Sequence, residues 1–302
     1  MPTIKANNID ITYESFGKAS DPTVLMIMGL GGQLTMWTDK LVDDLVAGGY
    51  RVITFDNRDI GLSHHHSGEK TPNIIRQILL RRIGIKIKSP YELRDMAHDT
   101  IGLMDALKLK EVHLVGISMG GMIGQHVSAI APDRVASFTA IMTTTGNPKL
   151  PRPGRQIMQA MIRRGPQPTT RDAIIDQSVR TFGIIGTPGE DQNTNGMRDR
   201  ITRSYDRSYN PAGVIRQMSA IIAAGDFRKY TRRIKAPTLV IHGNRDPLVP
   251  IEGGYEIAKL VHGARMEVID GMGHDVPPRF LPQITKLLLD HFGHTRVYSP
   301  AE

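Results

Sequence analysis

The sequence predicts an α/β fold in which a mostly parallel sheet is covered by helices on both faces. Three observations lead to this prediction. Short apolar segments of the strand type alternate with longer helical patterns along the chain. One of these segments runs directly into a Gly-x-Ser-x-Gly turn, and a helical pattern follows at once. Near the end of the chain, two further strand-like segments lead into loops that carry an aspartate and a histidine.

The predicted strands are short and mostly apolar, as expected for segments buried between two layers of helices. Residues 9–15 alternate in the manner of an edge strand of a hairpin. The other strands, in chain order, are predicted at residues 24–28, 52–55, 112–115, 138–142, 238–242 and 266–269. Helical patterns lie between them, at residues 37–47, 91–107, 119–131, 251–261 and 280–292.

The alternation stops between Thr143 and Lys235, where the chain is rich in Arg, Gln, Met, Pro and Gly. This segment carries only helical patterns, at residues 156–164, 171–181, 196–205 and 214–223. A helical insert between two strands would roof a site at that edge of the sheet. We therefore predict a core domain of residues 1–146 and 231–302 with a helical cap of residues 147–230. Within the cap, the polar segment 186–196 predicts a mobile loop.

The Gly-x-Ser-x-Gly turn predicts a nucleophile elbow, with Ser118 as the nucleophile. A tight strand-to-helix turn crowds the backbone around the serine, so the residues two before and two after it should lack side chains. Gly116 and Gly120 meet that demand. Gly121 and Gly124 would let the following helix lie close to the sheet.

A serine hydroxyl needs a base to remove its proton and a third group to orient that base. His274 follows a predicted strand in a glycine-rich turn, and Asp246 follows another strand, so both should lie at the same sheet edge as Ser118. The chain order serine, aspartate, histidine is the one expected for this kind of elbow. Asp270 and Asp275 flank the histidine, but a carboxylate so near in sequence rarely points at the ring.

Acyl transfer also needs hydrogen-bond donors for the negative oxygen of the tetrahedral intermediate. The backbone N–H of Met119 would supply one donor at the positive end of its helix. The second should come from the glycine-rich loop after the strand at 24–28, where the N–H of Leu30 is the candidate and that of Gly31 the next choice.

The substrate would lie between this loop and the cap, where methionines offer an adaptable apolar surface. We expect the substrate-binding residues to be Gly29, Gly31, Trp37, Met142, Met158 and Met218.

Taken together, these residues make the chain resemble the α/β-hydrolase fold superfamily. The motifs that carry the resemblance lie at residues 28–32, 55–63, 116–121, 242–250 and 271–277. The Met-Gly start of the first motif and the Arg-Asp-x-Gly-x-Ser pattern of the second are similar to the aclacinomycin methylesterase-like branch. The resemblance implies an eight-stranded, mostly parallel sheet with the helical cap inserted after strand 6. It also implies a carboxylic ester hydrolase without a cofactor, with Ser118 as nucleophile, His274 as base, Asp246 as its orienter and the Leu30 and Met119 amides as the oxyanion hole.

Composition agrees with a single enzyme of this kind. No apolar run approaches the roughly 20 residues that span a bilayer, and no signal peptide is indicated, so we expect a cytoplasmic protein without stable membrane insertion. The chain has no cysteine, and its net charge of +8 is combined with only 5% aromatic residues, which does not favour nucleic-acid binding. Histidines at positions 64–66 are consecutive and lack accompanying ligands, so we expect no metal site. His242 is expected to be a structural residue below the site.

A basic amphipathic stretch at residues 72–88 could rest on an anionic membrane or guide substrates, but packing against the cap is the preferred interpretation. The partner we expect is a small-molecule ester, and the sequence leaves open whether the protein is a homodimer.

The sequence thus predicts a serine carboxylesterase that acts on short to medium acyl esters or methyl esters. A carbon–carbon bond hydrolase, a lactonase or a cofactor-free perhydrolase could use the same three residues. A non-catalytic binding module on the same scaffold is disfavoured because the catalytic residues are all present.

Overall fold

The computed structural model describes residues 1–68, 70–162 and 168–294. Within these residues, eight strands form one sheet in the order β1-β2-β4-β3-β5-β6-β7-β8. β2 pairs antiparallel with both β1 and β4, and all the other neighbours are parallel. The strands are β1 (Thr3–Ala6), β2 (Ile9–Phe16), β3 (Thr23–Ile27), β4 (Arg51–Phe55), β5 (Val112–Ile117), β6 (Val135–Ile141), β7 (Thr238–Gly243) and β8 (Arg265–Ile269).

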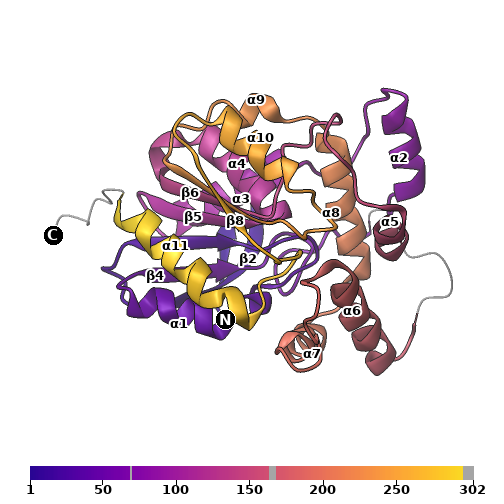
Figure 1. The fold of residues 1–302 in the computed structure, drawn as a ribbon, viewed down its shortest axis with the longest axis horizontal. Helices are drawn as coiled ribbons and strands as arrows, with labels where there is room; N and C mark the ends of the chain where they lie inside the picture. The colour runs from indigo at the N-terminus through magenta and orange to yellow at the C-terminus, as the bar shows by residue number, and fades with distance from the viewer. Residues whose placement is uncertain (69, 163–167, 295–302) are drawn as a thin grey trace.

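Helices cover both faces of this sheet, as predicted (Figure 1). One face is packed by α1 (Asp39–Ala47) and α11 (Leu281–Gly293), and the other by α3 (Leu93–Ala106), α4 (Met119–Ile130) and α10 (Glu252–Leu260). Successive side chains of a strand point to opposite faces. Val24 and Met26 of β3 accordingly belong to the core on the α1 side, while Leu25 and Ile27 belong to the core on the α4 side.

In the described residues, the segment between β6 and β7 that runs from α5 to α8 carries four helices, and we call this segment, with its connecting loops, the helical insert. The helices are α5 (Arg155–Ile162), α6 (Arg171–Ile185), α7 (Met197–Arg207) and α8 (Pro211–Ala224). Each corresponds to one of the predicted helical patterns, although positions 163 and 164 of the first pattern lie outside the described residues. Figure 1 shows α5, α6 and α7 grouped at one side of the molecule, with α8 running between α5 and the sheet. The division into a core and a cap at residues 147 and 230 stays a prediction.

Three details differ from the sequence expectations. The strand at residues 9–16 is not the edge, because β1 pairs with its outer side. Helix α1 begins at Asp39, and Trp37 ends a preceding 3₁₀ turn (Leu34–Met36) rather than opening the helix. The loop predicted to be mobile contains two buried side chains, Thr187 and Gln192, that are hydrogen-bonded to the core.

Two further helices flank the insert in the described part of the chain. A short helix, α9 (Arg228–Thr231), leads from the insert back to β7, and α2 (Ile74–Arg82) packs against α8. Across the described ranges, no helix is both long enough and apolar enough to cross a bilayer.

Candidate active site

The backbone around Ser118 has the strained geometry of a nucleophile elbow. Ser118 lies between β5 and α4 with φ of 54° and ψ of −118°, a conformation that non-glycine residues rarely adopt. A Cβ built on Gly116 would lie 2.3 Å from the carbonyl oxygen of Gly120, and one built on Gly120 would lie 2.0 Å from that of Ile27. No side chain fits at either position, so the prediction that both must be glycine is confirmed.

The first turn of α4 lies close to the sheet, as the sequence predicts. A Cβ at Gly121 would come within 2.6 Å of the Thr143 side chain, and one at Gly124 within 2.4 Å of the Phe138 ring. Thr143 also donates a hydrogen bond of 2.7 Å to the carbonyl oxygen of Ser118. The nucleophile turn is therefore held from both the helix side and the sheet side.

Ser118, His274 and Asp246 come together although long stretches of chain separate them. They follow the carboxyl ends of β5, β8 and β7, which share one edge of the parallel sheet. Nδ1 of His274 lies 2.7 Å from Oδ2 of Asp246, and Nε2 lies 3.0 Å from Oγ of Ser118. The ring thus bridges the carboxylate and the hydroxyl, both at hydrogen-bond distance. Asp246 and His274 are buried, whereas Ser118 is partly accessible.

The carboxylate of Asp246 is held in its charged form. Burial alone would raise its pKa. The charge of His274, hydrogen bonds from His242 and His274, and the Val249 N–H outweigh burial, so the pKa of Asp246 lies well below its usual range. The backbone N–H groups of Leu248 and Val249 donate to Oδ1 at 2.9 and 2.8 Å. His242 lies 3.5 Å from Oδ2 and reaches the Val249 carbonyl oxygen at 2.8 Å. His242 therefore braces the carboxylate directly, which is a closer role than the one expected from the sequence.

The two rival carboxylates are engaged elsewhere. Asp270 accepts a hydrogen bond from the Asn244 side chain on the exposed surface. Asp275 accepts from the backbone N–H and the hydroxyl of Thr187. Neither arrangement brings a carboxylate to the imidazole of His274, which agrees with the choice of Asp246.

Two backbone amides beside Ser118 are available to a ligand. A Cβ on Gly29 would lie only 3.2 Å from Cβ of Ser118, so the loop after β3 runs directly beside Ser118. In the described part of the chain, neither the Leu30 N–H nor the Met119 N–H donates a hydrogen bond to another protein group. The N–H of Gly31, the second choice from sequence, is occupied, because it donates to Oε1 of Gln217 at 2.9 Å.

Gln217 of α8 fixes the loop that carries the Leu30 amide. Its side chain is fully buried, accepts from Gly31 and donates 2.9 Å to the carbonyl oxygen of Arg58. Gly31 has φ of +70°, and a Cβ there would contact Val214, so α8 packs directly on the loop. The helical insert is thereby joined to the predicted oxyanion loop.

The loop after β4 holds the insert through buried ion pairs. Asp59 forms two hydrogen bonds with Arg216 of α8, at 2.7 and 2.8 Å, and Asp56 pairs with Arg207 of α7 at 2.7 Å. Burial would raise the pKa of Asp59, but the hydrogen bonds from Arg216 lower it overall. For Asp56, burial prevails and the pKa is raised despite its hydrogen bonds and the nearby Arg207 charge.

The six predicted substrate-binding residues are divided between the site and the core. Gly29 and Gly31 lie beside the nucleophile and under α8, as described above. Met218 is half-buried on α8 one turn after Val214, and Met158 is half-buried on α5. The prediction that Met142 lines the pocket is wrong, because its side chain is fully buried in the core on the α1 side. The ring of Trp37 is buried in the same core.

Among the residues that the structure describes, no group of three or more His, Asp or Glu side chains is placed to hold a metal ion. His65 bonds the Gly61 carbonyl oxygen, and the rings of His64 and His66 contact each other.

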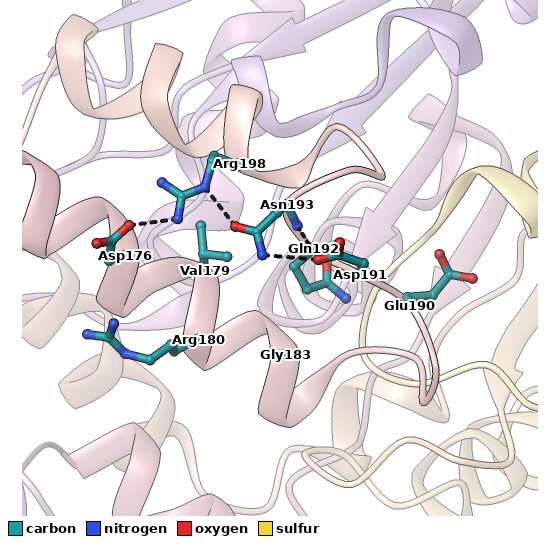
Figure 2. A pocket seen from close by; sticks show the side chains of 9 residues that line it. All are labelled: Asp176, Val179, Arg180, Gly183, Glu190, Asp191, Gln192, Asn193 and Arg198. Carbon is teal, nitrogen blue, oxygen red and sulfur yellow. Dashed lines mark hydrogen bonds and ion pairs between the residues drawn. The ribbon is translucent and has the colours of Figure 1, made fainter.

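A polar pocket of about 430 Å³ lies on the insert, lined by α6, the start of α7 and the loop between them (Figure 2). Arg198 donates there to Asp176 and to Asn193. None of the predicted catalytic residues lines this pocket.

Comparison with known proteins identifies the family. Residues 22–277 match the family model described as the alpha/beta hydrolase fold. The chain belongs to the α/β-hydrolase family. The predicted resemblance and fold class are therefore confirmed.

Several curated and solved α/β-hydrolases align with this chain over almost its full length. The rhodomycin D methylesterase DnrP of Streptomyces peucetius is 24% identical over 298 residues, which cover 92% of this chain and 93% of that protein. The 2-hydroxy-6-oxononadienedioate/2-hydroxy-6-oxononatrienedioate hydrolase of Paraburkholderia xenovorans is 26% identical over 293 residues, covering 95% and 91%. The crystal structure of an enol-lactonase from Burkholderia xenovorans superimposes with a TM-score of 0.73 at 23% identity, covering 97% of this chain and all of that one. These relatives are all hydrolases, which supports hydrolase chemistry for this α/β-hydrolase.

Sequence reasoning missed the residues that join the insert to the site of this α/β-hydrolase. One signal was available, because Arg216 and Gln217 interrupt an otherwise apolar pattern in α8. Buried polar side chains almost always have hydrogen-bond partners, so such a pair indicates a contact with another part of the chain. The partner cannot be read from local periodicity.

Proposed function

We propose that this α/β-hydrolase is a serine carboxylesterase that acts on methyl esters or on esters with short to medium acyl chains. The observation that carries the proposal is the imidazole of His274, which bridges the carboxylate of Asp246 and the hydroxyl of Ser118. The two unoccupied amides beside that hydroxyl support it, since an acyl-transfer intermediate needs donors at that place.

The proposed reaction proceeds through an acyl-enzyme. With Nδ1–H donating to Asp246, Nε2 of His274 accepts the proton of Ser118 as Oγ attacks the ester carbonyl carbon. The carbonyl oxygen becomes an oxyanion held by the Leu30 and Met119 amides. The intermediate collapses, the carbon–oxygen bond to the alcohol breaks, and His274 gives its proton to the leaving oxygen. Water then attacks the acyl-enzyme while His274 takes its proton. The bond between the acyl carbon and Oγ of Ser118 breaks, His274 returns the proton to Oγ, and the free acid leaves.

Two observations support a small ester as the substrate. Met158 and Met218 of the insert are half-buried, and one of the relatives is a methylesterase. Two alternatives keep the same three residues. The first is a lactonase, because the enol-lactonase relative acts on a cyclic ester. The second is a carbon–carbon bond hydrolase, because the substrates named for the dienedioate hydrolase contain no ester group. A cofactor-free perhydrolase also remains open.

A fluorophosphonate probe and a substrate panel test the proposal together. We expect the probe to label wild-type protein at Ser118 and to leave Ser118→Ala unlabelled, with the same melting temperature for both. No labelling of folded wild type would indicate a binding module rather than an enzyme. We expect p-nitrophenyl acetate and butyrate to be turned over much faster than lactones or the vinylogous diketones that a carbon–carbon hydrolase would cleave. The reverse order would favour the lactonase or the carbon–carbon hydrolase.

A further inference from the structure

The segment from Pro72 to Lys88 exposes apolar side chains that the rest of the protein does not cover. Ile75, Leu79 and Ile83 are 40%, 55% and 71% exposed, and Ile85 is 45% exposed. These are four of the ten large apolar side chains that are exposed in the described part of the chain. The spacing of four residues places the first three in one stripe along the outer side of α2. We call this stripe, together with Ile85, the α2 outer face.

The opposite side of the segment is anchored to the helical insert. Gln77 is buried and donates to Oγ of Ser219 on α8 at 2.9 Å, and to the carbonyl oxygen of Lys88 at 3.1 Å. Ile87 is also buried, and Asn73 caps the start of α2 through the Arg76 N–H. The segment is therefore a packed element with one side on α8 and the other side uncovered. The sequence favoured packing of its apolar side on the cap, but four of its large apolar side chains are exposed.

Cations surround the α2 outer face without any acidic residue among them. The segment contains Arg76, Arg81, Arg82, Lys86 and Lys88 and no Asp or Glu. Arg81 lies against the backbone of Gly225 at the end of α8, and the other four are exposed. An apolar stripe flanked by cations is the pattern by which a short helix rests in the interface of an anionic bilayer, with aliphatic side chains among the acyl chains and cations at the phosphates.

We propose that the α2 outer face binds the surface of an anionic lipid bilayer. A second copy of this chain is a poorer occupant, because a symmetric contact would bring the same cations together. A stable protein interface buries about 800 Å² on each partner and is enriched in aromatic residues. This face is one stripe of aliphatic side chains, and the segment has no aromatic residue. An acidic protein partner is left as an outcome of the test.

The location of the face would link the bilayer to the active site. α8 contacts α2 through Ser219 and contacts the loop beside Ser118 through Gln217. The bilayer would therefore lie one helix away from the nucleophile, where an apolar ester dissolved in lipid is concentrated. The binding itself does not depend on the proposed esterase activity.

Vesicle flotation of the full-length protein tests the proposal. Vesicles contain either pure phosphatidylcholine or about 30% phosphatidylglycerol, at about 0.05 M and about 0.5 M salt. We expect binding to the anionic vesicles at low salt, with little binding to the neutral vesicles or at high salt. Each cation near an anionic surface contributes roughly fivefold in affinity, so Arg76→Glu with Arg82→Glu should lower binding by more than tenfold.

Matched variants separate this surface from general charge and general hydrophobicity. Leu79→Ser with Ile83→Ser should abolish binding, whereas Ile184→Ser, which removes an apolar side chain exposed on α6, should not. Lys110→Glu with Lys259→Glu makes the same charge change elsewhere and should lower binding far less than the α2 pair. Unchanged hydrolysis of a soluble ester without vesicles would show that the α2 variants are folded.

Three results would overturn the proposal. The first is wild-type protein that does not float with anionic vesicles. The second is a Leu79→Ser, Ile83→Ser variant that floats as well as the wild type. The third is a wild-type dimer in light scattering, or a complex with an acidic polypeptide, that is lost in the same double variant while lipid binding is absent.

Discussion

Thr187 of the helical insert holds the carboxylate of Asp275, a residue 88 positions away in the sequence. The backbone N–H of Thr187 donates to Oδ1 at 2.8 Å, and its hydroxyl bonds the same oxygen and accepts from the Gly273 N–H at 2.9 Å. The N–H of His274 donates to the Ile185 carbonyl oxygen at 2.9 Å. The loop that carries His274 is therefore hydrogen-bonded to the insert at three successive residues, Gly273, His274 and Asp275.

Loss of the Thr187 hydroxyl should misplace the imidazole. We expect Thr187→Val to lower kcat about tenfold or more with a smaller change in KM, because a small displacement of a catalytic group weakens proton transfer. Thr187→Ser keeps the hydroxyl and should retain most of the activity. Steady-state kinetics at a temperature well below both melting temperatures separate this effect from instability. Equal kcat values for the valine and serine variants would show that the hydroxyl does not position the ring.

Asp246→Asn should lower activity far more than Asp270→Asn, which replaces an aspartate close to His274 in the sequence. The amide favours the wrong tautomer of His274, and the expected loss is on the order of 10³ to 10⁴ in kcat. Asp270→Asn changes an exposed hydrogen bond to Asn244 and should stay near wild type. Measured kcat values for the two variants decide the assignment. A crippled Asp270→Asn beside an active Asp246→Asn would mean that the wrong acid was chosen.

The rate of ester hydrolysis should show a single acidic limb. The depressed pKa of Asp246 keeps that carboxylate charged throughout the range above about pH 4, so it adds no limb of its own there. A base must be unprotonated to accept the proton of Ser118, so kcat/KM should rise with pH along one acidic limb and then level off. Initial rates at low substrate concentration from pH 5 to about 8.5 test this. A flat profile would count against His274 as the base.

Two buried histidines should make the fold sensitive to acid. Burial lowers the pKa of both His113 and His126 to about 4. Unfolded chains take up these protons near pH 6.5, so the unfolded state binds more protons between about pH 6.5 and 4. The free energy of unfolding is therefore highest above about pH 6.5 and falls as the pH drops, by on the order of 3 kcal/mol per ring. Urea unfolding at several pH values measures it. His126→Gln should flatten the slope, and His262→Gln, at an exposed position, should leave it unchanged.

Gln217→Met should impair the oxyanion loop more than it impairs binding. Removing an oxyanion donor outright lowers kcat by about 10² to 10³, and a loosened loop should lose part of that, about tenfold or more. The matched control is Gln77→Met, which removes another buried amide that contacts α8, but from α2 and without touching the loop. Affinity for a trifluoromethyl ketone should fall with kcat in the first variant alone. Parallel losses in both variants would indicate general destabilisation.

The features that could be predicted from the sequence are those recorded in neighbouring residues. The elbow at Ser118 was predictable because glycines at fixed offsets are required by the crowded turn. Asp246 and His274 were predictable because each follows an apolar strand, and the carboxyl ends of parallel strands share one edge. β1 was missed as a separate strand, since Ala6 is the sole buried residue in its four positions.

Contacts between distant segments could not be predicted in the same way. The bonds from Gln217 to Gly31 and from Thr187 to Asp275 join residues that local patterns place only on a helix or in a loop. Met142 was predicted to line the pocket but does not. A bulky apolar residue at the carboxyl end of a strand can point into the core as easily as into the site. Its side chain follows the face of the sheet that α1 and α11 cover.

The buried pairs Asp56–Arg207 and Asp59–Arg216 limit how substrate range can be engineered or evolve in this molecule. A chimera whose new insert lacks both arginines would leave two carboxylates without their partners, and an uncompensated buried charge typically costs about 3–5 kcal/mol. The insert is therefore not an exchangeable part by itself. The unit of exchange is the insert together with the loop after β4, and new substrate specificity is more accessible through single changes on the insert that leave Arg207, Arg216 and Gln217 in place.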